Sequence, residues 1–275
     1  MGEPSENTKY VKIFILIIFF AAIISLIYKG ISTIRSSTFQ HESYNLLLID
    51  QNVYVVHIDK SDNSLASIKI PNKRSLFVAR NRLSQSLLLS IPIDGVIISK
   101  KVDGFSDFDR EVFTLQNALP FLINPLNYKF SNVNSFDIMK FSYYARSVPK
   151  SSKVFQTISQ FSKNGFSDKD VALLKKIVVD KAIFNNKASL QIINTTDIDG
   201  LASRFSNMLK NAGYNIVSID TGKNQKSKII AKDLKSDSVK RLRDFLDVSV
   251  VASQEDNSIA DITIILRVDM SSKIK

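Results

Sequence analysis

The sequence predicts an α/β (α+β) protein in three parts: an N-terminal transmembrane helix, a mixed α/β middle domain, and a small βαββαββ sandwich at the C-terminus. Three observations predict this architecture. One uncharged apolar run lies near the N-terminus, apolar runs of β type follow it, and strand and helix patterns alternate over the last ~85 residues. A hydrophobic content of 44% is enough to bury a core, so wholesale disorder is excluded.

The apolar run Ile13–Tyr28 contains sixteen residues without a charge. Val11 lengthens it if Lys12 extends outward, which brings it close to the span of a bilayer core of roughly 30 Å. We therefore expect a cytoplasmic tail over 1–12, an anchor over 13–28 and a polar linker over 29–43.

Two questions about this segment stay open. A small-residue site at Gly30-Ile31-Ser32 would also suit a cleaved signal peptide. The length of the run and the absence of a clearly positive segment before it favour a retained anchor. A short tail before a long folded domain favours an extracytoplasmic domain, whereas Lys29 and Arg35 favour the opposite orientation.

The middle of the chain holds the next set of elements. Five apolar runs of β type are expected before residue 100, the second and third of them forming an antiparallel hairpin: 46–49, 53–58, 65–70, 87–91 and 96–99. The pattern over residues 112–126 predicts neither a helix nor a strand. A helix over 167–179 is indicated by a Ser167 cap, by Asp170 reaching back to it, and by a Phe166–Val171 staple.

Beyond residue 185 the pattern is regular. A helix with apolar residues at 201, 205, 208, 209 and 212 ends at Gly213, which suits the left-handed conformation of a helix C-terminus. The expected order is strand, helix, strand, strand, helix, strand, strand, over 190–193, 201–212, 214–219, 229–231, 238–246, 248–252 and 262–268.

Composition excludes several kinds of site. The chain has no cysteine, so disulfides, zinc–thiolate sites and a cysteine nucleophile are absent. The two histidines, His41 and His57, are too few for most histidine metal sites and show no nucleophilic-triad pattern. Thr221-Gly222-Lys223 lacks the upstream glycine of a phosphate loop. We expect no metal, no cofactor and no catalytic residue. Asp197 and Asp199 are expected to cap a helix rather than to bind a cation.

The formal charge is +11, and residues 43–187 carry twenty Lys or Arg against twelve Asp or Glu. The basic residues Lys73, Arg74, Arg80 and Arg82 are candidates for binding an anion. A solvated basic loop explains them equally well, and beside an anchor an anionic glycan or lipid headgroup is a better target than nucleic acid.

Several separated motifs of the last part resemble one family. The motif residues are Asn194, Thr195, Thr196, Gly200, Gly213 and Asp261, in the segments Asn-Thr-Thr, Gly-Leu-Ala, Ala-Gly-Tyr and Ala-Asp-Ile-Thr-Ile. These segments resemble the C-terminal domain of LytR-type proteins, over residues 186–275. The resemblance implies the sandwich fold and a place in the bacterial cell envelope, but no assigned reaction.

Residues 44–185 resemble a degenerate LytR-CpsA-Psr domain, whose members transfer glycopolymers from a polyprenyl-pyrophosphate carrier to peptidoglycan. The family's Arg-x-Asp-Thr falls on Ile49, Gln51 and Asn52, and its Pro-Arg-Asp on Pro71, Asn72 and Lys73. The metal-holding Asp and the pyrophosphate-binding Arg are therefore not matched, and Asn and Gln supply no negative charge for magnesium.

Three hypotheses follow. The first is a single-pass, non-catalytic binding or scaffold protein of the cell wall. The second is a glycopolymer transferase with displaced groups at Arg80, Arg82, Asp94 and Arg110, taking a polyprenyl-pyrophosphate lipid. The third is a partner-binding subunit with no glycan role. The ligand and the oligomeric state are not determined by the sequence.

Overall fold

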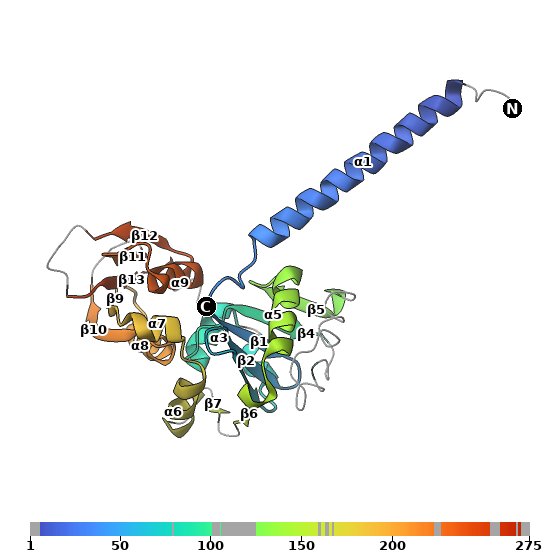
Figure 1. Ribbon diagram of the computed structural model, residues 1–275. Helices are drawn as coiled ribbons and strands as arrows, with labels where there is room; N and C mark the ends of the chain where they lie inside the picture. Colours follow the sequence, from blue (N-terminus) through green and yellow to red (C-terminus); the bar gives the residue numbers. More distant parts are fainter. Residues whose placement is uncertain are drawn as a thin grey trace.

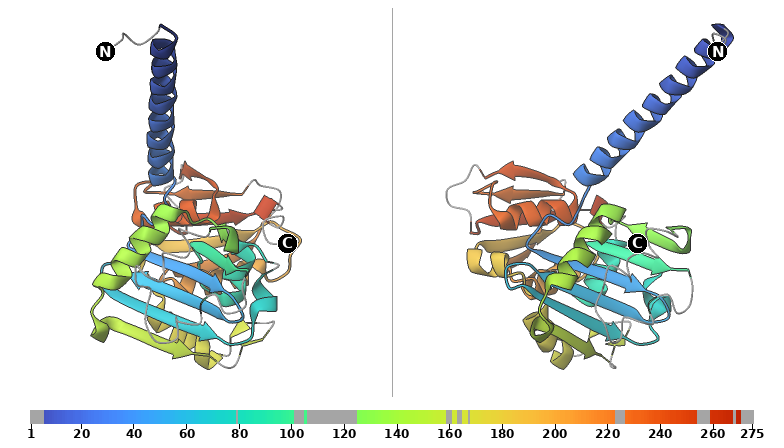
Figure 2. Two further views of the ribbon diagram at one scale, coloured as in Figure 1. Left: turned by 90° about the vertical axis from the view of Figure 1, so that its right-hand side faces the viewer. Right: turned by 45° about the vertical axis from the view of Figure 1, so that its right-hand side comes forward.

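The computed structural model describes residues 6–78, 80–100, 105, 125–158, 161–162, 165–166, 168–222, 227–253, 259–267 and 269–270. It is a mixed α/β protein with one long N-terminal helix, which confirms the predicted fold class. Figures 1 and 2 show this helix projecting from a body in which two sheets lie side by side.

Helix α1 (Glu6–Arg35) is longer than the predicted anchor at both ends. Its stretch from Tyr10 to Arg35 is long and apolar enough to cross a membrane, and none of it is buried against the body. The first residues of the predicted linker are helical because a single Gly30 costs a helix only about 1 kcal/mol. The Thr33 hydroxyl also donates to the Lys29 carbonyl.

The middle domain is built on a six-stranded sheet with the order β5-β4-β1-β2-β3-β6. The hairpin predicted from the second and third runs is confirmed, since β2 pairs antiparallel with β3. Strand β1 also pairs with β4 in parallel. The strands are β1 (Ser43–Ile49), β2 (Val53–Asp59), β3 (Ser64–Ile70), β4 (Gly95–Ser99), β5 (Tyr128–Ser131) and β6 (Lys153–Thr157).

Both faces of this sheet are covered. Leu46 and Leu48 of β1 pack on one side with Phe141 of α5 (Ser135–Ser147). Their neighbours Leu47 and Ile49 pack on the other side, in a cluster that includes residues of α2 (Arg74–Phe77) and α6 (Asp168–Ile177). Every residue of β1 and β2 is therefore buried, as expected for strands between two layers.

One prediction for the middle domain was wrong. The apolar run 87–91 is not a strand, because residues 82–89 form α3 (Arg82–Leu89), capped by Asn81, whose side chain accepts from the Ser84 N–H. The helix predicted to run to about 179 is present as α6, which ends at Ile177, and a separate helix, α7 (Lys181–Asn186), follows. The proposed cap Ser167 lies outside the described residues. A short hairpin, β7 (Phe161–Ser162) with β8 (Gly165–Phe166), precedes α6.

The predicted βαββαββ order of the C-terminal domain is confirmed. Its sheet has the order β10-β9-β13-β11-β12, and both helices contribute to a single core with its strands. The elements are β9 (Ser189–Asn194), α8 (Leu201–Asn211), β10 (Asn215–Thr221), β11 (Lys228–Ala231), α9 (Asp237–Leu246), β12 (Ser249–Ala252) and β13 (Ile262–Leu266).

Helix α3 joins the two domains. Leu83 and Leu87 on this helix belong to the core of the C-terminal domain, whereas Leu89 belongs to the core of the middle domain. The Asn211 side chain at the end of α8 also donates to the Ser90 carbonyl. Because one short helix supplies both cores, the two sheets are held next to each other by packing.

Candidate functional site

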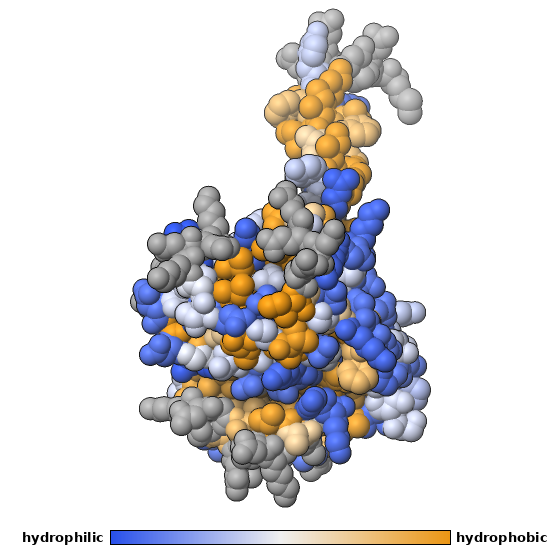
Figure 3. Space-filling model, turned by 90° about the vertical axis from the view of Figure 1, so that its left-hand side faces the viewer, coloured by the Kyte–Doolittle hydropathy of each residue, from blue (hydrophilic) through white to orange (hydrophobic). Residues whose placement is uncertain are grey.

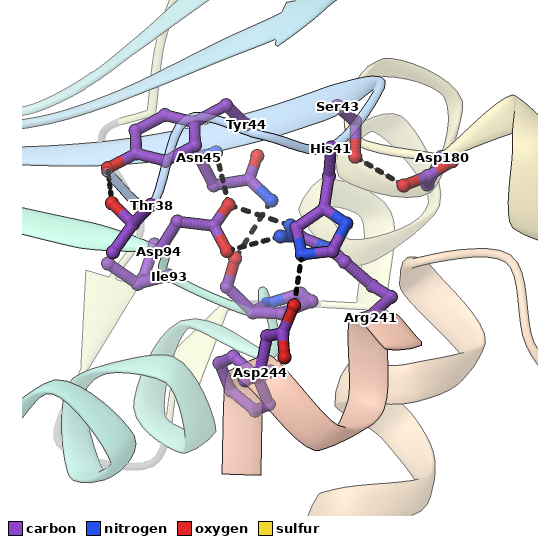
Figure 4. Close-up of polar contacts among 12 residues, drawn as sticks. Thr38, His41, Ser43, Tyr44, Asn45, Ile93, Asp94, Asp180, Arg241 and Asp244 are labelled. Carbon is purple, nitrogen blue, oxygen red and sulfur yellow. Dashed lines mark hydrogen bonds and ion pairs between the residues drawn. The ribbon is translucent and has the colours of Figure 1, made fainter. Parts of the chain in front are cut away.

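A polar pocket of about 230 Å³ lies at the junction between the linker, the middle domain and α9, and is called the junction pocket below. Three segments that are far apart in the sequence meet there (Figure 4). Its lining is Ser37, Thr38, Gln40, His41, Arg82, Asp94, Asn132, Arg241, Arg243 and Asp244.

A buried ion pair between Arg241 and Asp94 forms the wall of the pocket. The two guanidinium nitrogens of Arg241 contact the two carboxylate oxygens of Asp94 at 2.6 and 2.7 Å. Asp94 also accepts from the Asn45 N–H at 2.7 Å. Burial alone would lower the pKa of Arg241, but the carboxylates of Asp94 and Asp180 raise it above its ordinary value. Arg241 therefore stays charged in the interior.

Arg82 crosses from α3 to the C-terminal domain. It donates to the Ile93 carbonyl at 2.9 Å and to the Phe245 carbonyl at 2.7 Å. Its guanidinium also lies 5.0 Å from the centre of the Phe245 ring. Burial lowers the pKa of Arg82. No ion pair with Arg82 is found among the described residues, so its positive charge is not neutralised directly.

His41 brings the linker into the pocket. Its Nε2 lies 3.2 Å from Asp244, which in turn contacts the Nε of Arg243 at 2.8 Å. Burial and the nearby Arg241 charge lower the pKa of His41, which favours a neutral imidazole that can both donate and accept a hydrogen bond.

The linker is held in place by Asp137 at the start of α5. One of its oxygens accepts from the Ser37 hydroxyl at 2.6 Å and from the N–H groups of Thr38 and Phe39 at 2.9 and 3.1 Å. Its other oxygen accepts from the Asn134 N–H, which completes a capping box. The end of α1 is thereby fastened next to the junction pocket.

The four predicted anion-binding residues do not gather in this pocket. Arg82 lines it, whereas Arg74 donates to the Ser99 carbonyl and Arg80 donates to the Leu76 carbonyl. Lys73 lies immediately before α2. A shared anion site for all four stays a prediction.

Two of the four groups proposed for a displaced transferase site, Arg82 and Asp94, do lie together in the pocket. Arg80 does not line it, and Arg110 lies outside the described residues.

The motif residues of the C-terminal domain are structural. Asn194 accepts from the Thr196 N–H at 3.0 Å, and Thr195 donates its hydroxyl to the Leu266 carbonyl. Asp261 accepts from the side chain and the N–H of Ser189, and these hydrogen bonds lower its pKa. Gly213 has a φ of 105°, a conformation that favours glycine.

One capping prediction was wrong. The N-cap of α8 is Gly200, in the left-handed region, and no side chain caps this helix. Asp197 and Asp199 therefore do not have the capping role expected of them, because glycine itself takes the position from which a cap would act.

Sequence reasoning missed Arg241, Asp244 and the role of His41. Arg241 lies beside Val239 and Leu242 on the buried face of α9, so a charged residue next to an apolar stripe was the available signal. Its partner Asp94 is 147 residues away, and no local pattern indicates that pairing.

Comparisons with known proteins bear on the C-terminal domain. Residues 187–269 match the family LytR_C, described as "LytR cell envelope-related transcriptional attenuator". The curated proteins give no match.

Two solved structures show weak likeness. The Lin1025 protein from Listeria innocua is 11% identical, with a TM-score of 0.32, and the alignment covers 49% of this chain and 95% of that one. The putative transcriptional factor Lmo1026 from Listeria monocytogenes is 12% identical, with a TM-score of 0.30, covering 44% and 81%. Both TM-scores are too low to carry a functional conclusion.

Proposed function

Because residues 187–269 form a LytR_C domain, we propose that the protein is a single-pass protein of the bacterial cell envelope that binds an anionic cell-wall component without catalysis. Helix α1 is long and apolar enough to span the membrane. In this proposal the soluble body lies outside the membrane, and Asp137 holds it close to the surface through the linker.

The non-catalytic role is supported by the contacts that the carboxylates of the junction pocket already make with protein donors. Asp94 is occupied by Arg241 and by the Asn45 N–H, and Asp244 lies between Arg243 and His41. Phosphoryl transfer assisted by magnesium needs carboxylate oxygens that can reach a metal. Here those oxygens bind protein donors instead.

The remaining charge favours an anionic ligand. The pocket is lined by three arginines and two aspartates, so its formal charge is positive. Arg243 is half exposed, with 53% of its side chain accessible, and can turn toward a phosphate or carboxylate of a wall glycopolymer.

The test is co-sedimentation of the full chain, reconstituted in nanodiscs, with purified sacculi that keep or lack their anionic glycopolymers. We expect retention only on the anionic sacculi, weakened by salt. Arg243→Gln should reduce retention several-fold, whereas Arg204→Gln, at an exposed position of α8, serves as the matched control. Equal retention on both kinds of sacculi would contradict the proposal.

A second candidate is the transferase, supported by the proximity of Arg82 and Asp94 in one pocket. Incubating the nanodisc protein with magnesium and a polyprenyl-pyrophosphate-linked glycan separates the two candidates. Transfer of the glycan to peptidoglycan would replace the binding role with a catalytic one.

A further inference from the structure

A second, larger groove lies away from the junction pocket, between α6, α7, the end of α8 and the start of β10. Its volume is about 1040 Å³, and it is called the lysine groove below. Its floor is apolar and is formed by Val179, Phe184, Tyr214 and Ile216.

The residues that form the floor of the groove are tightly packed. A Cβ at Gly213 would lie 3.2 Å from both Phe184 and Val179, so these side chains pack directly on the backbone. The Tyr214 hydroxyl donates to the Ser238 carbonyl inside the domain, which leaves its ring as apolar lining. Phe184 is nevertheless 58% exposed. A large aromatic side chain that stays exposed among tightly packed residues is typical of a surface that a partner covers.

The rim of the groove has the opposite character. Among the residues that the structure describes, five lysines and no carboxylate line it: Lys175, Lys176, Lys181, Lys187 and Lys210. Lys181 contacts Asp62. For the other four no ion pair is found in the part of the chain that the structure describes. Lysines gathered around an apolar floor attract a ligand that is both negative and apolar.

The position of the groove favours a protein partner over a lipid surface. Figure 1 shows α6 at the end of the body away from the projecting helix α1, with α7 between the two. The α6 side of the groove therefore lies away from the membrane that would hold α1. Figure 3 shows the side of the body that carries β10, where apolar and strongly hydrophilic surface lie next to each other.

The neighbouring strand adds main-chain partners. Asn215 and Ile216 line the groove and begin β10, which is the outer strand of its sheet. An extended segment can pair with the free edge of such a strand while its side chains fill pockets beside it.

We propose that the lysine groove binds an acidic, amphipathic, extended segment of a partner protein. Its apolar side chains cover Phe184 and Ile216, and its carboxylates contact the lysine rim. This site is independent of the junction pocket and of the glycan-binding role proposed for it.

The test uses the full chain in nanodiscs of uncharged lipid and a fluorescein-labelled peptide that alternates glutamate with leucine and phenylalanine. Fluorescence anisotropy should show binding that weakens as salt is added. The double substitution Phe184→Ser with Lys187→Glu should weaken binding by about tenfold or more. The matched control, Leu234→Ser with Lys235→Glu, changes a pair that is also exposed but lies outside the groove and should leave the affinity unchanged.

Three results would overturn the proposal. A peptide with serine in place of leucine and phenylalanine could bind equally well, which would show charge attraction alone. The Phe184 and Lys187 substitutions could leave the affinity unchanged. Vesicles containing phosphatidylglycerol could displace the peptide, which would make a lipid headgroup the occupant. Circular dichroism of both variants checks that the exposed substitutions leave the fold intact.

Discussion

The two large sheets of this protein differ in how many of their faces are covered. In the middle domain, neighbouring residues of β1 enter two different cores, so that all seven residues are buried. In the C-terminal domain, buried and partly exposed residues alternate along β11, and only one face of the sheet meets the helices. The comparison shows that the C-terminal sheet keeps one face partly exposed, whereas the central strands β1 and β2 of the middle sheet are buried on both faces.

The difference also determines where polar groups are placed. Inside the doubly covered sheet, His57 is fully enclosed and bonds the Asn45 side chain at 2.8 Å. At the junction, Arg241 and Asp94 meet where the C-terminal domain closes the end of the middle domain. Two charged residues therefore meet in the contact between the domains, while Asp50 and Asp59 are also buried within the middle domain.

The strongest test of this comparison breaks the contact between the domains. Asp94→Asn should reduce the free energy of unfolding by about 3–5 kcal/mol, because it leaves the buried Arg241 charge uncompensated. Urea denaturation of the full chain in detergent measures the change. Asp244→Asn, at a more exposed position in the same pocket, should cost less than about 1 kcal/mol. Equal losses would show that the ion pair does not hold the domains.

The next test uses pH to probe the doubly covered sheet. Burial lowers the pKa of His57 from 6.5 to about 4. The unfolded chain therefore binds a proton at higher pH than the folded chain does, and stability falls as pH decreases from 6.5 toward 4. The loss is on the order of 3 kcal/mol over that window. Denaturation midpoints measured across this range should fall as the pH decreases. In a His57→Gln variant, the midpoint should depend less steeply on pH. An unchanged slope in the variant would assign it to other groups.

A matched set of valine substitutions tests the covered and open faces directly. Val55 and Val56 lie in the two opposite cores of the middle sheet, with 0% and 2% of their surface exposed. Val55→Ala and Val56→Ala should each cost about 2 kcal/mol. Val251 on β12 is 40% exposed, and Val251→Ala should cost less than about 0.5 kcal/mol. A Val251 effect as large as that of Val56 would mean that a partner covers this face.

The last test changes one hydrogen-bonding side chain at a helix start in each domain. Ser236 accepts from the Val239 N–H and caps α9 only, so Ser236→Ala should cost about 1 kcal/mol. Asp137 completes the capping box of α5 with the N-cap Asn134 and also holds the linker, so Asp137→Ala should cost about 2 kcal/mol. Spin labels on α1 and α5 should report a broader distance distribution for Asp137→Ala, and an unchanged distribution would show that other contacts fasten the linker.

Local patterns predicted much of the fold. Alternation over 65–70 and helical spacing over 201–212 depend on neighbours a few residues apart, which is why those elements were predicted correctly. The run 87–91 was misassigned because a short apolar run suits a helix and a strand equally well. The segment is helical because Asn81 caps it and because Leu83 and Leu87 pack on the core of the C-terminal domain.

The candidate site was much less accessible to sequence reasoning. Basic residues near Arg82 were recognised, but only Arg82 enters the junction pocket. Lys175 and Lys210 in the lysine groove come from different helices and meet only through packing.

The sequence by itself determined the membrane-length helix and the βαββαββ order of the C-terminal domain that matches LytR_C, because an uncharged run and a set of strand and turn motifs depend on neighbouring residues. The tertiary structure alone decided that Arg241 pairs with Asp94, that His41 of the linker meets Asp244, and that a ring of lysines surrounds Phe184. These partners meet because the apolar residues of two cores, both of which include residues of α3, pack together. The free energy of that packing depends on residues from the whole chain, so no local pattern reveals it.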